Sequence, residues 1–162
     1  LVVILLTVSS NISIPFYPVP MTLQTLVVFF IAASMGMIGF YSTFIYVVLG
    51  VLGLPLFANG GGIGYIFSPT FGFLYGMVIS AFMIAYILKS ELNTSLIKLS
   101  ATILAGAFVI FLCGISHLSF FVGLEQAINL GLLPFLYSEF LKIVLAIAII
   151  FGLIQRVNQK NS

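Results

Sequence analysis

The chain has 162 residues, of which 62% are hydrophobic and only 5% are charged. Soluble domains carry about 25% charged residues, so this composition excludes an ordinary soluble protein. The formal net charge of +2 is too small to indicate a nucleic-acid partner. A single cysteine, Cys113, excludes an internal disulfide and a cysteine metal cluster.

The first 88 residues contain no Asp, Glu, Lys or Arg. This run is several times longer than the roughly 20 residues that cross a bilayer core. The sequence therefore predicts an all-α membrane protein, with residues 1–162 forming a single polytopic domain in the plasma membrane. Because the chain starts with Leu inside a hydrophobic stretch, we expect its first helix to be truncated at the N-terminus.

Prolines, glycines and short polar pieces divide the chain into six expected transmembrane helices. Residues 22–54 would form one helix of about 50 Å, which is too long for a core of about 30 Å, so we expect a break between Gly36 and Gly39. The prolines of 15–20 and the glycine-rich stretch 55–69 are expected loops, and 119–131 is an expected looser connection. The six helices are then expected before residue 13 and at about 22–36, 39–54, 70–88, 96–118 and 132–155.

The basic residues predict the orientation of these helices. Lys89 and Lys98 flank one connection, and Arg156 and Lys160 lie in the C-terminal tail. Two helices separate these segments, so both lie on one side, which the positive-inside rule assigns to the cytoplasm. The N-terminus shares that side. The proline loop, the glycine loop and the 119–131 connection then lie on the outer face.

Glu139 and Lys142 form a charged pair inside the last hydrophobic segment, three residues apart on one helix face. Each such charge costs about 2.5–3.5 kcal/mol on insertion scales, so intramembrane ionisable residues are functional-site hypotheses by default. The alternative is a mutually neutralising pair that only helps the helix to insert. A lysine suits an anionic ligand group, and a nearby carboxylate suits N–H donors. The pair therefore favours a small ligand with a carboxylate and a polar head.

Four further residues near the expected outer face are candidate ligand contacts. Asn59 carries an amide that matches a urea-like or amide-like group, or it is a turn residue before the glycines. Gln24 is either a second contact or a link between helices. Tyr65 either walls an apolar pocket or belongs to an interfacial belt. Gly61 belongs to the glycines that let backbone close over a ligand.

His117 is the one histidine and has no cysteine neighbour, so no metal site is expected. Ser116 and His117 are adjacent and rarely face each other on a helix, which disfavours nucleophilic catalysis. The glycines of 60–64 follow no strand and lack a following lysine, so they are no nucleotide loop. We therefore expect no catalytic residue and no cofactor, with an intramembrane enzyme using Glu139 or His117 and a purely structural subunit as alternatives.

Three stretches together resemble the biotin-binding membrane subunit of energy-coupling factor (ECF) transporters, the BioY family. They are ISIPFYPVPMTLQTL at 12–26, LGLPLFANGGGIGYIFSPTFGFLYG at 52–76 and LGLLPFLYSEFLKIVLA at 130–146. The resemblance covers essentially the whole chain. It implies a substrate-capture component with six transmembrane helices that binds biotin at the outer side, under the loops after helices 1 and 3.

The resemblance also implies roles and partners. Lys142 matches the lysine that holds the valerate carboxylate of biotin, and Glu139 stands where the family usually has the aspartate that holds the ureido ring. Asn59 matches the ureido-binding amide. Biotin is then the transported ligand rather than a cofactor, and the expected partners are a transmembrane coupling subunit, two ATPase subunits and the lipid bilayer. A capture subunit for another vitamin or a biotin precursor is the alternative within this class.

Overall fold

The computed structural model describes residues 1–89 and 94–161. Short irregular segments join the helices, including a short 3₁₀ helix, η1 (Ile63–Phe67), and an antiparallel pair of two-residue strands, β1 (Ser13–Ile14) and β2 (Met21–Thr22). The α-helices of the described residues are α1 (Val2–Asn11), α2 (Gln24–Met35), α3 (Met37–Val51), α4 (Phe71–Leu88), α5 (Leu96–Val122), α6 (Leu124–Gly131) and α7 (Leu133–Asn161).

Three of these helices, α4, α5 and α7, are long and apolar enough to cross a membrane. The helices α1, α2 and α3 are also apolar, but they have only 10, 12 and 15 residues. At 1.5 Å per residue, 15 residues extend about 22 Å, which is less than the bilayer core. The fold is therefore mostly helical, with three clear candidates for membrane spans among the described residues.

The break between α2 and α3 confirms the prediction made from Gly36 and Gly39. Gly36 has φ 57° and ψ −130°, a backbone conformation that L side chains rarely adopt. A side chain at Gly39 would collide with the carbonyl group of Ile31. One glycine therefore makes the sharp turn, and the other lets the two helices pack closely beside it.

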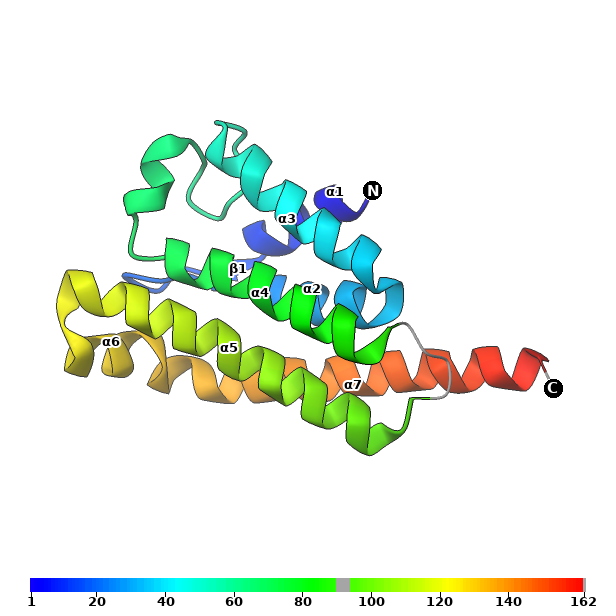
Figure 1. The fold of residues 1–162 in the computed structure, drawn as a ribbon. Helices are drawn as coiled ribbons and strands as arrows, with labels where there is room; N and C mark the ends of the chain where they lie inside the picture. Colours follow the sequence, from blue (N-terminus) through cyan, green and yellow to red (C-terminus); the bar gives the residue numbers. More distant parts are fainter. Residues whose placement is uncertain (90–93, 162) are drawn as a thin grey trace.

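Figure 1 shows the helices as a bundle whose connections gather at its two ends. The β1–β2 hairpin, the loop that contains η1, and the turn from α5 into α6 lie at one end. The α2–α3 turn, the end of α4, the start of α5 and the C-terminus lie at the other. The expected grouping of the proline loop, the glycine loop and the 119–131 connection at one end is thus confirmed.

Part of the expected pattern at that end is wrong. The 119–131 segment is no loose connection, because α5 continues to Val122 and α6 follows at once. Gly123, with φ 83°, forms the sharp turn between them, and its N–H donates to the carbonyl oxygen of Ser119. Ala127 and Gly131 of α6 are buried, Gly131 close to Leu118 of α5. This short helix is thus held by packing against α5 and α7.

The polar C-terminal segment is also helical, whereas a tail was expected after residue 155. The helix α7 runs on to Asn161, because no proline or glycine interrupts it after Gly152. It extends past the rest of the bundle at the C-terminal end in Figure 1. Between Lys89 and Lys98, residues 90–93, which include Glu91, lie outside the described residues.

Candidate functional site

Glu139 and Lys142 lie on one face of α7, as their spacing predicted, and there they form a buried ion pair. The Nζ atom of Lys142 lies 2.9 Å from Oε2 of Glu139. The two residues are only 4% and 8% exposed. The helix places them one turn apart on the side that faces α2, so the two charges neutralise each other inside the bundle.

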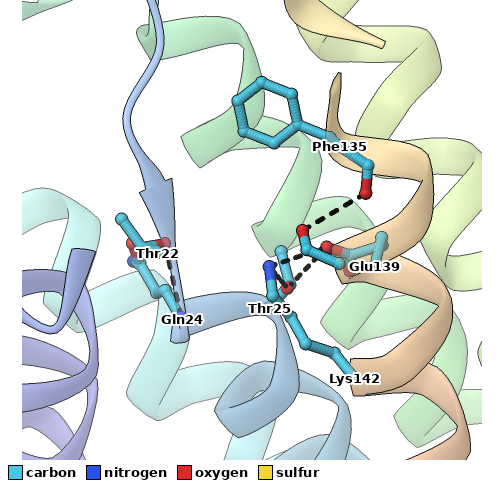
Figure 2. A network of polar contacts seen from close by, with 7 residues as sticks. Thr22, Gln24, Thr25, Phe135, Glu139 and Lys142 are labelled. Carbon is cyan, nitrogen blue, oxygen red and sulfur yellow. Dashed lines mark hydrogen bonds and ion pairs between the residues drawn. The ribbon is translucent and has the colours of Figure 1, made fainter. Parts of the chain in front are cut away.

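A third residue, Thr25 of α2, completes this cluster (Figure 2). Its hydroxyl donates to Oε2 of Glu139 at 3.0 Å and accepts from Nζ of Lys142 at 3.3 Å. Thr25 is itself buried. The sequence reasoning missed this residue, although it lies next to Gln24 within the stretch 12–26 that carries part of the family resemblance. The one available signal was a hydroxyl residue at the start of an apolar helix.

Two buried polar atoms at this site have no hydrogen-bond partner among the described residues. They are Oε1 of Glu139 and Nε2 of Gln24. Leaving a buried polar group unpaired costs about 1–3 kcal/mol, and more when the group is charged. Each atom therefore has unused capacity for a ligand: the carboxylate oxygen accepts a hydrogen bond, and the amide nitrogen donates one.

These two residues line two adjoining cavities of about 40 Å³ each. Glu139, Lys142 and Thr25 border one cavity, and Gln24 and Tyr65 border the other. The wall between and around them is largely apolar, since both cavities share Val19, Pro20, Thr22, Phe73 and Met77. Ligand pockets usually measure roughly 300–1,000 Å³, so a ligand of that class fits only when hairpin residues between the cavities move aside.

Tyr65 brings a hydroxyl group to the second cavity from η1. Its oxygen accepts a hydrogen bond from Thr70 at 3.1 Å, which leaves its own proton free to donate. Burial raises the pKa of the Tyr65 phenol above its usual value, and the hydrogen bond from Thr70 partly offsets this rise. Tyr65 is therefore a neutral donor at physiological pH.

The structure does not bring Asn59 to either cavity. The N–H groups of Phe57 and Gly60 donate to each other's carbonyl oxygens, at 2.9 and 3.0 Å. This pairing closes a two-residue turn, which leaves Asn59 exposed at its tip while Ala58 lines the second cavity. The placement differs from the ligand contact expected of Asn59, and its physical cause is the turn.

Gly61 packs against the end of α3 rather than over a cavity. A side chain at this position would collide with the carbonyl oxygen of Leu54. The next N–H, of Gly62, donates to the carbonyl oxygen of Gly50 at 2.7 Å. Gly61 therefore lets the loop approach α3 closely, and this contact sets the position of the residues that follow it.

His117 is engaged in a structural contact. Its Nε2 atom lies 3.1 Å from the carbonyl oxygen of Ser68. Since a carbonyl can only accept, Nε2 carries the proton. Nothing here resembles a nucleophile and its base, and the described residues contain no group of three metal-ligating side chains.

The geometry suits binding rather than reaction. An ion pair with no net charge lies at one end of the site, amide and phenol donors lie at the other, and apolar walls lie between them. The model of the BioY family matches residues 1–159. The chain belongs to the BioY family. Relatives of this chain within the family are named as transporters, not as enzymes.

Several curated relatives cover most of the chain. The "Biotin transporter BioY" of Thermotoga maritima is 39% identical over 145 residues, which are 88% of this chain and 85% of the relative. The "Probable biotin transporter BioY" of Pyrococcus horikoshii is 37% identical over 151 residues, 92% of this chain and 89% of the relative. This agreement confirms the family resemblance inferred from the three motif stretches.

The fold has a counterpart among solved structures. The S-component for biotin from an ECF-type ABC transporter superposes with a TM-score of 0.82, over 94% of this chain and 86% of that one. Sequence identity in this comparison is 22%, so the likeness concerns the fold. The all-α fold expected from the composition is thus similar to the fold of that S-component.

Proposed function

We propose that this chain is the substrate-binding membrane subunit of a vitamin uptake transporter and captures biotin. Membership of a family whose relatives are named biotin transporters supports this function. The observation that carries it is the buried cluster of Glu139, Thr25 and Lys142, with one carboxylate oxygen unpaired, beside an apolar cavity. A merely structural pair has no need of a free acceptor at such a cavity.

The chemistry of biotin matches the two ends of the site. Its ureido group is neutral, with N–H donors and a carbonyl acceptor, and it joins an apolar bicycle with a carboxylate-bearing chain. An ureido N–H donates to Oε1 of Glu139, and the ureido carbonyl accepts from the Lys142 ammonium. Phe73, Met77 and the other apolar residues shared by both cavities cover the bicycle.

The charge balance leads us to assign the biotin carboxylate to the other end of the site. Sequence reasoning assigned it to Lys142, but Lys142 already has Glu139 as a partner 2.9 Å away. A second carboxylate there would confront Glu139, which repels a like charge, whereas a neutral urea complements both members of the pair. Gln24 and Tyr65 supply donors for the carboxylate in the adjoining cavity.

We further propose that α1 to α5 and α7 are the six membrane-crossing segments, with both termini on the cytoplasmic side of the plasma membrane. Lys98 lies in the first turn of α5 and Arg156 in the C-terminal part of α7. The start of α5 and the C-terminus lie at the end of the bundle opposite the β1–β2 hairpin in Figure 1, which supports this orientation. A coupling subunit and two ATPase subunits would then drive import. A reporter fused to the C-terminus that is active only in the cytoplasm tests the orientation: an inactive reporter contradicts it.

Calorimetric titration of the detergent-solubilised chain with biotin tests the function. The double variant Glu139→Gln/Lys142→Met removes both charges while keeping side chains of similar size. We expect saturable binding by wild type and at least a tenfold weaker affinity for the double variant, since a hydrogen bond to a charged group contributes about 1.5–3 kcal/mol. Lys98→Met, an exposed lysine at the other end, is the matched control and should bind as wild type does.

Absence of binding by wild type contradicts the proposed function. The direction in which biotin lies in the site is tested by repeating the titration with biotin methyl ester. Gln24→Leu should weaken binding of biotin about threefold to tenfold, from the loss of one hydrogen bond, and should change ester binding little. A loss of discrimination between acid and ester in Lys142→Met, but not in Gln24→Leu, contradicts the assignment of the carboxylate to Gln24 and Tyr65.

A further inference from the structure

The loop from Gly53 to Thr70 closes the Tyr65 side of the site, and it is tied down on two sides. Its first half is held by α1 and α3. Ser10 and Tyr46 donate their hydroxyl hydrogens to the carbonyl oxygen of Leu56, at 2.7 and 2.9 Å. Its second half reaches across to α5, where Nε2–H of His117 donates to the carbonyl oxygen of Ser68 at 3.1 Å.

A chain of hydrogen bonds runs from this anchor to the cavity. The hydroxyl of Ser68 lies 3.0 Å from the hydroxyl of Thr70. Thr70 donates in turn to the hydroxyl of Tyr65 at 3.1 Å. Thr70 and Tyr65 both line the second cavity. The position of the Tyr65 hydroxyl thus depends on where Ser68 is held.

The surroundings of His117 fix its ring in place. The ring packs against Phe121, Tyr75 and Phe71, with centroid distances of 5.4, 5.9 and 6.2 Å. Gly72 of α4 faces the Cβ atom of His117 so closely that a side chain at Gly72 would collide with it. An aromatic cage and a close helix contact therefore aim Nε2 at the loop.

We infer that His117 is a positioning residue for ligand capture, which anchors the second half of the 53–70 loop on α5 and thereby holds the Tyr65 hydroxyl at the ligand cavity. The effect on ligand binding rests on the proposed function. The anchoring of the loop rests on the hydrogen bonds described above. His117 itself does not line either cavity of the site. Its effect on binding passes through Ser68, Thr70 and Tyr65.

Two substitutions separate the hydrogen bond from the shape of the ring. His117→Leu removes the donor, and His117→Gln keeps an N–H donor at a similar distance from the backbone. Ser116→Ala, a neighbour that is exposed on α5, serves as the control. Hydrogen exchange of the loop amides is measured on each protein without ligand, and the dissociation rate of radiolabelled biotin is measured on the same preparations.

We expect His117→Leu to speed exchange in residues 63–70, but not on the α3 side of the loop, and to speed biotin dissociation by about three- to tenfold, the loss of one net hydrogen bond. His117→Gln should show an exchange rate and a biotin dissociation rate close to those of wild type. Unchanged exchange in His117→Leu overturns the inference, and so do equal defects in the two variants, which would point to the ring shape. If wild type fails to bind biotin, the proposed function fails, and the exchange data still decide the anchoring role.

Discussion

The two sides of the site are built in different ways. On one side, Glu139 and Lys142 stand on a long helix, and Thr25 of α2 bridges them across the helix contact. On the other side, Tyr65 stands on a 3₁₀ helix of only five residues within a loop. Groups on packed helices are held within tight limits, whereas a loop opens at a lower cost in free energy. We therefore expect the helices to select the ligand and the loop to control its entry and exit.

The largest effect should come from separating the buried charges. Lys142→Met leaves the Glu139 carboxylate buried without its ammonium partner, and breaking such a pair costs about 3–5 kcal/mol. Thermal unfolding followed by circular dichroism should show a marked drop in melting temperature. The double variant Glu139→Gln/Lys142→Met should recover most of that loss, because no buried charge remains. An unchanged melting temperature in Lys142→Met would show that the buried pair does not stabilise the helix side of the site.

Removing the bridge should have the next largest effect. Thr25→Val deletes the hydroxyl that contacts both charges, and hydrogen bonds to charged groups contribute about 1.5–3 kcal/mol. We expect biotin affinity to fall about tenfold or more, measured by titration. Thr43→Val is a matched control: Thr43 is also buried, but its hydroxyl donates to the Gly39 carbonyl oxygen within α3. If both variants weaken binding equally, the bridge has no specific role.

Two glycines of the 53–70 loop sharpen the comparison on the Tyr65 side of the site. Gly61→Ala introduces a methyl group against the carbonyl oxygen of Leu54, and overpacking of this kind costs about 1–3 kcal/mol. Gly64→Ala meets nothing within 4 Å and has no positive φ, so it should be tolerated. We expect Gly61→Ala, but not Gly64→Ala, to speed biotin dissociation, and to lower the melting temperature less than Lys142→Met does. Equal rates in the two variants would show that close packing on α3 does not hold the loop.

The smallest effect should come from Asn59→Ala. The side chain is exposed at the tip of the turn from Phe57 to Gly60, and surface substitutions of this kind usually change stability by less than about 0.5 kcal/mol. Biotin affinity should change less than about twofold. A large loss would show that this turn moves over the ligand on binding, which would restore the contact first expected for Asn59.

Much of the fold was accessible from sequence because its boundaries depend on local chemistry. Gly36 breaks a hydrophobic run that is too long for one span, and the predicted helix at 70–88 is α4 within one residue. The helix α6 was missed because Gly123 and Glu125 interrupt the hydrophobic pattern. The β1–β2 hairpin was missed because it depends on the pairing of Ser13 with Thr22 across the proline segment.

The sequence likewise predicted one part of the site and missed another. The spacing of Glu139 and Lys142 along one helix predicted their contact, which the structure has at 2.9 Å. Thr25 joins them from a position 114 residues away from Glu139, and no local pattern carries such a contact. The outward direction of Asn59 depends on a pair of backbone hydrogen bonds inside a glycine-rich turn, where several conformations are open to the chain.

The central claim is that a buried, mutually neutralised pair binds the neutral end of the ligand. The most direct test is an experimental structure of the chain with biotin bound. The account predicts the ureido group within about 3.2 Å of Glu139 and Lys142, with the carboxylate beside Gln24 and Tyr65. A biotin carboxylate bonded to Lys142, with the ureido ring under the loop, would contradict it.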